Sequence, residues 1–158
     1  MPSLNWKAFD SLSGSRSQNF ENLCRSLIRL HFGQHGQFLA RKNQPGVEFH
    51  LKLLETSQIL GAPPRWYGWQ CKLHSRIKNG DLSSASRKDI VDSLEKTEKE
   101  LPDLTDWVLW TPYTLSKKDQ TWFTGLKTRF RLHQYTDVDV ETYLCGPGVI
   151  LRSTYFDE

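Results

Sequence analysis

Two runs of alternating polar and apolar residues constrain the fold of this chain more than any other feature. The first run covers residues 47–54 and has Glu48 among its polar positions. The second covers residues 66–73, where Gln70 and Lys72 alternate with aromatic and apolar residues. Because successive side chains of a strand point to opposite faces, both runs predict strands with one polar and one apolar face. The sequence therefore predicts a sheet whose polar positions include Glu48, Gln70 and Lys72.

A helix is expected before these strands, from Ser17 to about His31, because apolar residues recur there at helical spacing. Ser15 or Ser17 is suited to begin it, and Gly33 follows its end. Its apolar stripe consists of Phe20, Leu23, Cys24, Leu27 and Ile28. Glu21 lies on the rim of that stripe, where an acid can face the sheet. A glutamate in the first turn is equally favoured by the helix dipole alone.

The rest of the chain alternates further strands with helices. Strands are expected at residues 37–42, 107–110 and 130–135, helices at 86–101, 119–126 and 138–144, a turn at 43–46 and a loop at 55–65. Ser86 with Asp89 is expected to start the first of these helices, and Asp137 is expected to cap the last. Strands interleaved with helices imply an α/β fold, with a mixed sheet covered on both faces. A length of 158 residues suits one compact domain.

Glu48, Gln70 and Lys72 are residue types that metal-dependent phosphodiester hydrolysis requires. This reaction needs a divalent ion to activate water, and positive charge to stabilise the transition state. Glu48 offers the oxygen ligand that Mg²⁺ prefers, and the Gln70 amide oxygen and the Cys71 backbone carbonyl can bind the same ion. Lys72 can orient the water or neutralise phosphate charge. A polar strand face is also typical of simple solvation, so the prediction depends on these residues occurring together.

Three motifs, taken in order, resemble the Mrr-like restriction endonuclease branch of the PD-(D/E)XK nuclease superfamily. They are Asn19-Phe20-Glu21-Asn22-Leu23, Pro45-Gly46-Val47-Glu48 and Trp69-Gln70-Cys71-Lys72. Each motif is degenerate by itself, and the specificity lies in their order across most of the chain. The resemblance implies a restriction-endonuclease-like α/β/α sandwich with a central mixed sheet over residues 1–145.

The resemblance also implies roles for individual residues. Glu48 becomes the metal-binding acid, Gln70 stands in place of the second acid, Lys72 is the catalytic lysine and Glu21 is the accessory acid. The implied cofactor is Mg²⁺ or Mn²⁺, held by Glu48, Gln70 and Cys71, and the implied partner is double-stranded DNA. Two departures are Glu in place of the usual Asp at position 48 and Gln in place of the second acid. The Gln form is familiar in this branch, although the lost charge should weaken metal binding.

Basic residues offer candidate contacts to the phosphates of a nucleic acid. Lys127, Arg129 and Arg131 alternate, so they share one face if their segment is a strand. Arg87 and Lys88 are further candidates on the helix at 86–101. Other basic clusters are Lys117-Lys118 and Arg76-Lys78. The formal net charge of +3 is only mildly basic, and such clusters are often merely solvated surface.

Several classes of protein and site are disfavoured. The sequence contains no apolar run near the ~20 residues that span a membrane, no secretory signal, no Gly-x-x-x-x-Gly-Lys-Ser/Thr loop and no Gly-x-Ser-x-Gly elbow. We therefore expect a soluble, cytoplasmic protein that does not hydrolyse ATP itself. Three scattered cysteines argue against a structural zinc site, and Cys24 and Cys71 are expected to be buried. His31 and His35 have metal-pair spacing, but Gly33 and Gly36 favour a loop.

Residues 146–158 are expected to form a C-terminal tail or the start of a linker to a further domain. Gly146-Pro147-Gly148 breaks regular structure, and apolar residues follow it. The passage resembles the junction between an Mrr-like effector and the NTPase part of large bacterial antiviral sensors of the STAND class. A terminal strand that packs back on the domain and a dimer contact are the alternatives.

Three functions are compatible with these residues. The first is a metal-dependent DNA endonuclease, free-standing or as an anti-phage defence effector, that works as a homo-oligomer because cutting both strands usually takes two sites. The second is a catalytically silent nucleic-acid-binding or partner-binding domain on the same fold. The third is another phosphodiesterase, which cleaves RNA or resolves junctions.

Overall fold

The computed structural model describes residues 4–40 and 46–158. Five strands form one mixed sheet in the order β1-β2-β3-β4-β5. The strands are β1 (Gly36–Leu39), β2 (Phe49–Leu53), β3 (Trp66–Cys71), β4 (Asp106–Trp110) and β5 (Arg131–Tyr135). The first three strands pair antiparallel, and β3, β4 and β5 pair parallel. The prediction of an α/β fold with a mixed sheet is confirmed.

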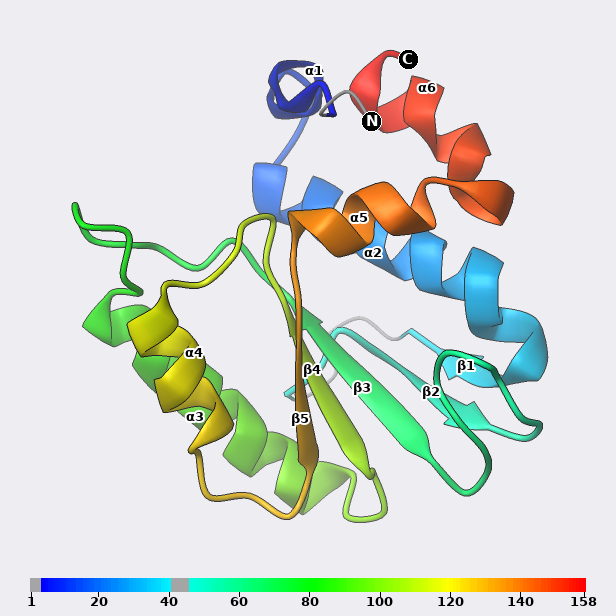
Figure 1. Ribbon diagram of the computed structural model, residues 1–158, viewed down its shortest axis with the longest axis vertical. Helices are drawn as coiled ribbons and strands as arrows, with labels where there is room; N and C mark the ends of the chain where they lie inside the picture. The colour runs from blue at the N-terminus through cyan, green and yellow to red at the C-terminus, as the bar shows by residue number, and fades with distance from the viewer. Residues whose placement is uncertain (1–3, 41–45) are drawn as a thin grey trace.

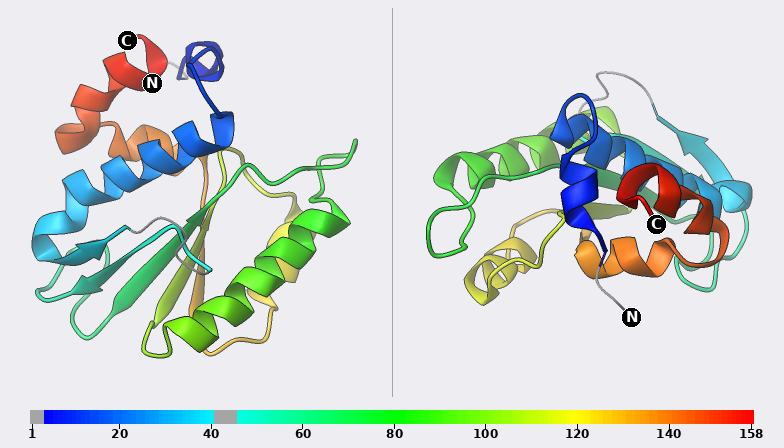
Figure 2. Two further views of the ribbon diagram at one scale, coloured as in Figure 1. Left: turned by 180° about the vertical axis from the view of Figure 1, so that it is seen from behind. Right: turned by 90° about the horizontal axis from the view of Figure 1, so that it is seen from above.

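Helices cover both faces of the sheet (Figures 1 and 2). The elements are α1 (Trp6–Asp10), α2 (Arg16–Phe32), α3 (Ser84–Glu100), α4 (Lys117–Thr124), α5 (Asp137–Tyr143) and α6 (Leu151–Phe156), with 3-10 turns η1 (Gly33–His35) and η2 (Gly146–Ile150). One apolar core joins α1, α2, α5 and α6 to one face, and a second joins α3 and α4 to the other. Within the described residues, every helix is too short or too polar to cross a lipid bilayer.

The helix predicted from Ser17 to His31 is confirmed as α2. The Ser15 hydroxyl accepts a hydrogen bond from the Gln18 backbone N–H, and Gly33 follows the last turn. All five residues of the expected apolar stripe are buried. Both predicted buried cysteines, Cys24 and Cys71, are also in this core.

Two helices are capped by residues other than those predicted. Ser83, not Ser86, caps α3, since its hydroxyl accepts from the Ser86 N–H. Thr136, not Asp137, caps α5, in a capping box with Asp139. The prediction was wrong in both places because several Ser, Thr and Asp residues stand in a row, and each can cap a helix.

β2, β3 and β5 are shorter than predicted, β4 begins one residue earlier, at Asp106, and the alternation of β2 fails at one residue. Val47 belongs to the core under α3, whereas Phe49 belongs to the core under α2, so the predicted shared apolar face does not extend to Val47. The strand begins only at Phe49, because the preceding chain turns at Gly46. Residues 41–45 of the expected strand and turn lie outside the described residues. Gly46 has φ of +80°, and a side chain there would collide with Thr97 of α3.

Residues 146–156 pack onto the same body as the rest of the chain. Phe156 is fully buried, with its ring 5.1 Å from Trp6 and 5.6 Å from Phe9 of α1. The first and last helices therefore lie side by side (Figure 1). That a further domain follows stays a prediction.

Asp106 lies buried at the start of β4, where three side chains hold its carboxylate. His133 Nε2 donates at 2.7 Å, Arg65 donates through two nitrogens, and the Thr105 hydroxyl donates at 2.6 Å. Burial by itself raises the pKa of Asp106, but the three hydrogen-bond donors outweigh it and lower that pKa to about 2. The folded state therefore favours the charged carboxylate.

We expect this cluster to make stability depend on pH in acid. A folded pKa below the unfolded value contributes stability above pH about 4, and that stability is lost as pH falls towards about 2. The loss should be about 2 kcal/mol in the free energy of unfolding. Urea denaturation at several pH values measures this loss. In Asp106→Asn, the free energy of unfolding should depend less on pH below about 4. An unchanged pH dependence in this variant would contradict the assignment.

Candidate active site

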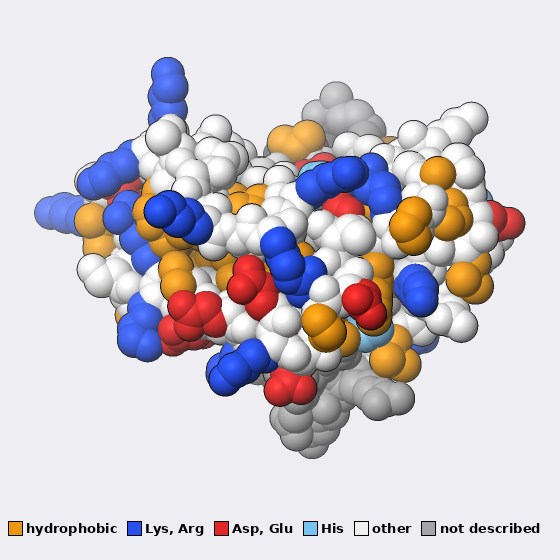
Figure 3. Space-filling model, turned by 90° about the horizontal axis from the view of Figure 1, so that it is seen from below, with side chains coloured by type: hydrophobic (Ala, Val, Ile, Leu, Met, Phe, Trp, Pro, Cys, Tyr) orange, Lys and Arg blue, Asp and Glu red, His pale blue; other side chains and the backbone are white. Residues whose placement is uncertain are grey.

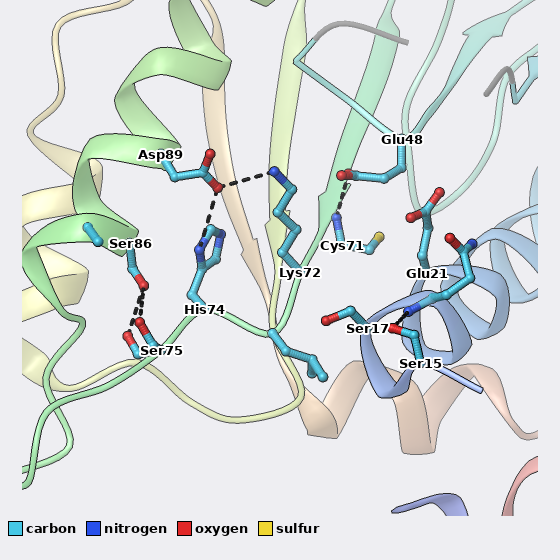
Figure 4. A pocket seen from close by; sticks show the side chains of 13 residues that line it. Ser15, Ser17, Glu21, Glu48, Cys71, Lys72, His74, Ser75, Ser86 and Asp89 are labelled. Carbon is cyan, nitrogen blue, oxygen red and sulfur yellow. Dashed lines mark hydrogen bonds and ion pairs between the residues drawn. The ribbon is translucent and has the colours of Figure 1, made fainter. Parts of the chain in front are cut away.

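A pocket of about 510 Å³ lies where β3 ends, between the first turns of α2 and α3 (Figure 4). Glu21 reaches it from α2, and Glu48 from the segment before β2. Lys72 reaches it from just after β3, and Asp89 from α3. The structure thus brings Glu21, Glu48 and Lys72, which are distant in sequence, to one pocket. Cys71 also lines it.

Glu48 is fixed to the end of β3 by backbone hydrogen bonds. Its N–H donates to the carbonyl of Trp69 at 2.9 Å, and its carboxylate Oε2 accepts from the Cys71 N–H at 2.8 Å. Burial raises the pKa of Glu48 to about 8, although the Cys71 N–H and the Lys72 charge lower it. A carboxylate that lacks enough compensating charge is suited to bind a cation.

Glu21 adds a second carboxyl group to the pocket. Burial raises the pKa of Glu21, and the charges of Arg25 and Lys72 lower it. The charge of Glu21 in turn raises the pKa of Glu48, so the two acids repel each other when both are ionised. A divalent ion between them would relieve that repulsion.

Lys72 forms an ion pair that the sequence pattern did not predict. Its Nζ lies 3.1 Å from Asp89 Oδ2, and both side chains are about half exposed. His74 Nδ1 lies 3.9 Å from the same oxygen. Burial lowers the pKa of His74 to about 4, so the imidazole is neutral at pH 7 and Lys72 is the cation that Asp89 faces.

Gln70 points from β3 towards α3 and is buried. Its amide nitrogen donates to the Ser93 hydroxyl at 2.6 Å, and its amide oxygen accepts from His74 Nε2 at 3.2 Å. Gln70 lines a neighbouring pocket together with Glu48, Lys72 and Asp89. Its amide oxygen therefore already has a donor, while its predicted role as a metal ligand stays a prediction.

Asp89, His74 and Ser93 are the residues that sequence reasoning missed at this site. A signal for two of them was present, because Ser86, Asp89 and Ser93 recur at helical spacing and so share the face of α3 that meets β3. Asp89 was interpreted only as part of a helix start.

The predicted nucleic-acid-binding cations lie apart from this pocket. Arg131 begins β5, and Arg129 donates to the backbone carbonyls of Leu101 and Leu104 before β4. These residues and Lys127 are at the opposite end of the sheet from Lys72. Because β5 begins only at Arg131, Lys127 and Arg129 precede the strand, and the three cations do not alternate along one strand face as predicted. The surface at that end, seen in Figure 3, mixes basic with acidic side chains.

Arg87 and Lys88 lie in the first turns of α3, but both have acidic partners. Arg87 donates to Asp119 at 2.6 Å, and Lys88 pairs with Asp92 at 2.7 Å. Neither residue lines the pocket that holds Glu48. Their contacts to nucleic acid stay predictions.

The donor set of the pocket fits an oxygen-preferring divalent ion through Glu48 and Glu21. Across residues 4–40 and 46–158, no group of three or more His, Cys, Asp or Glu side chains forms a metal site. An ion here would complete its coordination with water, backbone oxygen and substrate, as Mg²⁺ commonly does. His31 and His35 have separate partners, the carbonyl of Tyr143 and the carboxylate of Glu55.

No protein-family model and no curated protein matches the chain. The residues of the pocket are therefore the basis on which a function can be proposed.

Proposed function

We propose that this protein is a metal-dependent endonuclease that hydrolyses phosphodiester bonds of DNA. The observation that carries the proposal is the meeting of two partly buried carboxyl groups, Glu21 and Glu48, with the ammonium group of Lys72 in one open pocket. The similarity of the motifs to Mrr-like nucleases supports the same conclusion.

Glu48 and Glu21 would hold the ion, which is Mg²⁺ or Mn²⁺ in this proposal. When bound, the ion would polarise the scissile phosphate and lower the pKa of an attacking water. The raised pKa of Glu48 agrees with this assignment, because a desolvated carboxyl group gains most from a nearby cation.

Lys72 would bind the phosphate that lies next to the two acids. Its ammonium group lies at the edge of the pocket and is held from one side by Asp89. A fixed positive charge at this position stabilises the negative charge that develops as the phosphorus is attacked. Asp89 is then a positioning residue that keeps the ammonium group over the pocket.

Binding without catalysis is a second candidate function. The Gln70 amide is already paired with Ser93 and His74, and Gln70 replaces an acid that would add negative charge for the ion. Both observations favour a protein that binds nucleic acid on the same fold but does not bind the metal ion needed for cleavage.

The wider role belongs to the same proposal. As an anti-phage effector, the chain would act as a homo-oligomer, with an NTPase or sensor domain following it. Action in the cytoplasm fits this role.

Cleavage of supercoiled plasmid with Mg²⁺ or Mn²⁺ tests the nuclease proposal. We expect cutting that EDTA abolishes and that Lys72→Met lowers roughly 100- to 1000-fold. Lys7→Met is the matched control, because Lys7 is exposed on α1. Absence of cutting, or equal cutting by Lys72→Met, would rule out the assigned site.

Asp89→Asn should lower the cleavage rate roughly 10-fold, because Lys72 loses the carboxylate that holds its ammonium group. The thermal midpoint should change little, since exposed ion pairs add about 0–1 kcal/mol to stability. Asp92→Asn is the control, because it removes the similar pair with Lys88 on the same helix. Equal rates for both variants would show that Asp89 does not position Lys72.

A further inference from the structure

A second pocket of about 600 Å³ adjoins the candidate active site. Its walls share Leu73, His74 and Ser75 with the first pocket, so the two are continuous along the segment that follows β3. The remaining lining includes Arg16, Arg76, Lys78 and Tyr113. A ligand that is bound at Lys72 and extends along this segment therefore reaches the second pocket.

The guanidinium group of Arg76 lies over the ring of Tyr113 in this pocket. The guanidinium carbon of Arg76 lies 3.7 Å from the centre of the Tyr113 ring. The Tyr113 hydroxyl donates to the His74 carbonyl at 2.5 Å, which ties the ring to the segment that carries Lys72. Tyr113 is partly buried and Arg76 is exposed, so the guanidinium group presents a flat cation to solvent.

The charge of this pocket is available to an anion. Within the described residues, neither Arg76 nor Lys78 has an acidic side chain as an ion-pair partner, whereas Arg16 pairs with Asp10. The loop is held in place by hydrogen bonds from Ile77 to Asp81 and from Ser83 to Ser75. The guanidinium group of Arg76, over the Tyr113 ring, and the nearby ammonium group of Lys78 thus give this pocket two cations without acidic partners among the described residues.

We propose that this second pocket binds an unpaired nucleotide of the nucleic-acid substrate, next to the phosphate that Lys72 contacts. Flat guanidinium and aromatic groups stack with bases, and nearby cations bind the phosphates of the same strand. A base inside a duplex has both faces covered by its neighbours and cannot enter such a pocket. The preferred substrate is therefore DNA with a single-stranded segment beside the cleavage point, a segment that a supercoiled plasmid supplies where its strands transiently separate. This inference rests on the proposed function.

The test is DNA binding measured by fluorescence anisotropy in EDTA, where no cleavage occurs. The probes are a blunt duplex and the same duplex with a single-stranded tail. We expect the native chain to bind the tailed duplex roughly 10-fold more tightly. Tyr113→Leu should remove this preference, and Tyr113→Phe should keep it, because only the ring is needed for stacking.

Arg76→Lys is a second variant with little risk to the fold, because Arg76 is exposed. Lysine keeps the positive charge of Arg76 but lacks its planar guanidinium group, so the preference for the tailed duplex should fall. Equal binding of both probes by the native chain, or a preference unchanged in Tyr113→Leu and Arg76→Lys, would overturn the inference. The plasmid assay tests the proposed function separately. Cleavage without this preference would support the nuclease and contradict the second binding pocket. The preference without cleavage would support the binding pocket and contradict the nuclease.

Discussion

Replacing Glu48 with Gln is expected to lower metal-dependent DNA cleavage roughly 100- to 10,000-fold, because the ion would lose its best-placed carboxylate. In metal-free buffer at pH 7, the same variant should unfold at an equal or higher temperature. The pKa of Glu48 is raised to about 8 by burial, so its carboxyl group disfavours the folded state as pH rises from the unfolded value towards 8. A neutral amide removes that cost.

Three measurements on Glu48→Gln separate chemistry from folding. Plasmid cleavage gives the rate, calorimetric titration with Mn²⁺ gives metal binding, and thermal unfolding in EDTA gives stability. Glu95→Gln is the control, because Glu95 is exposed on α3. Retained cleavage in a folded Glu48→Gln protein would show that Glu48 is not the metal-binding carboxylate.

Phe156→Ala should lower the free energy of unfolding by about 3–5 kcal/mol, as is usual when a buried aromatic ring is truncated. Phe156 is fully buried, and it is stacked on Phe9 and in edge contact with Trp6. Removing it opens a cavity between α1 and α6. A chain cut after residue 145 should be more affected still, because it exposes the same surface of α1 to water.

Urea denaturation measures the change for Phe156→Ala. Val149→Ala in the same tail is the control, since Val149 is 52% exposed and should cost little. A loss below about 1 kcal/mol for Phe156→Ala would mean that residues 146–156 are not integral to the domain.

Much of the fold could be predicted because its signals are local. The stripe of α2 from Phe20 to Ile28 and the continuous apolar run of β4 each identify an element without help from elsewhere in the chain. Val47 shows where such reasoning stops. Its alternation is regular, but the close approach of Gly46 to α3 turns the chain and moves Val47 to the other core.

The candidate site could be predicted only in part, for a related reason. Glu48 and Lys72 could be predicted as site residues because each lies in a strand-like run and has a side chain suited to phosphodiester hydrolysis. Asp89 was missed because its relation to Lys72 depends on how α3 crosses β3, and a sequence pattern does not contain that angle. The partners of Gln70 depend on the same crossing.

The hydrogen bond from the Cys71 N–H to Glu48 joins the two ends of a hairpin at its open side. The loop between β2 and β3, residues 54–65, lies at the other end of that hairpin. Insertions and deletions in the loop can therefore change the number of residues between Glu48 and Lys72 without changing their distance in space. Relatives of this protein should keep the acid and the lysine while the spacing between them drifts, so a search pattern for them needs a variable gap between residues 53 and 66.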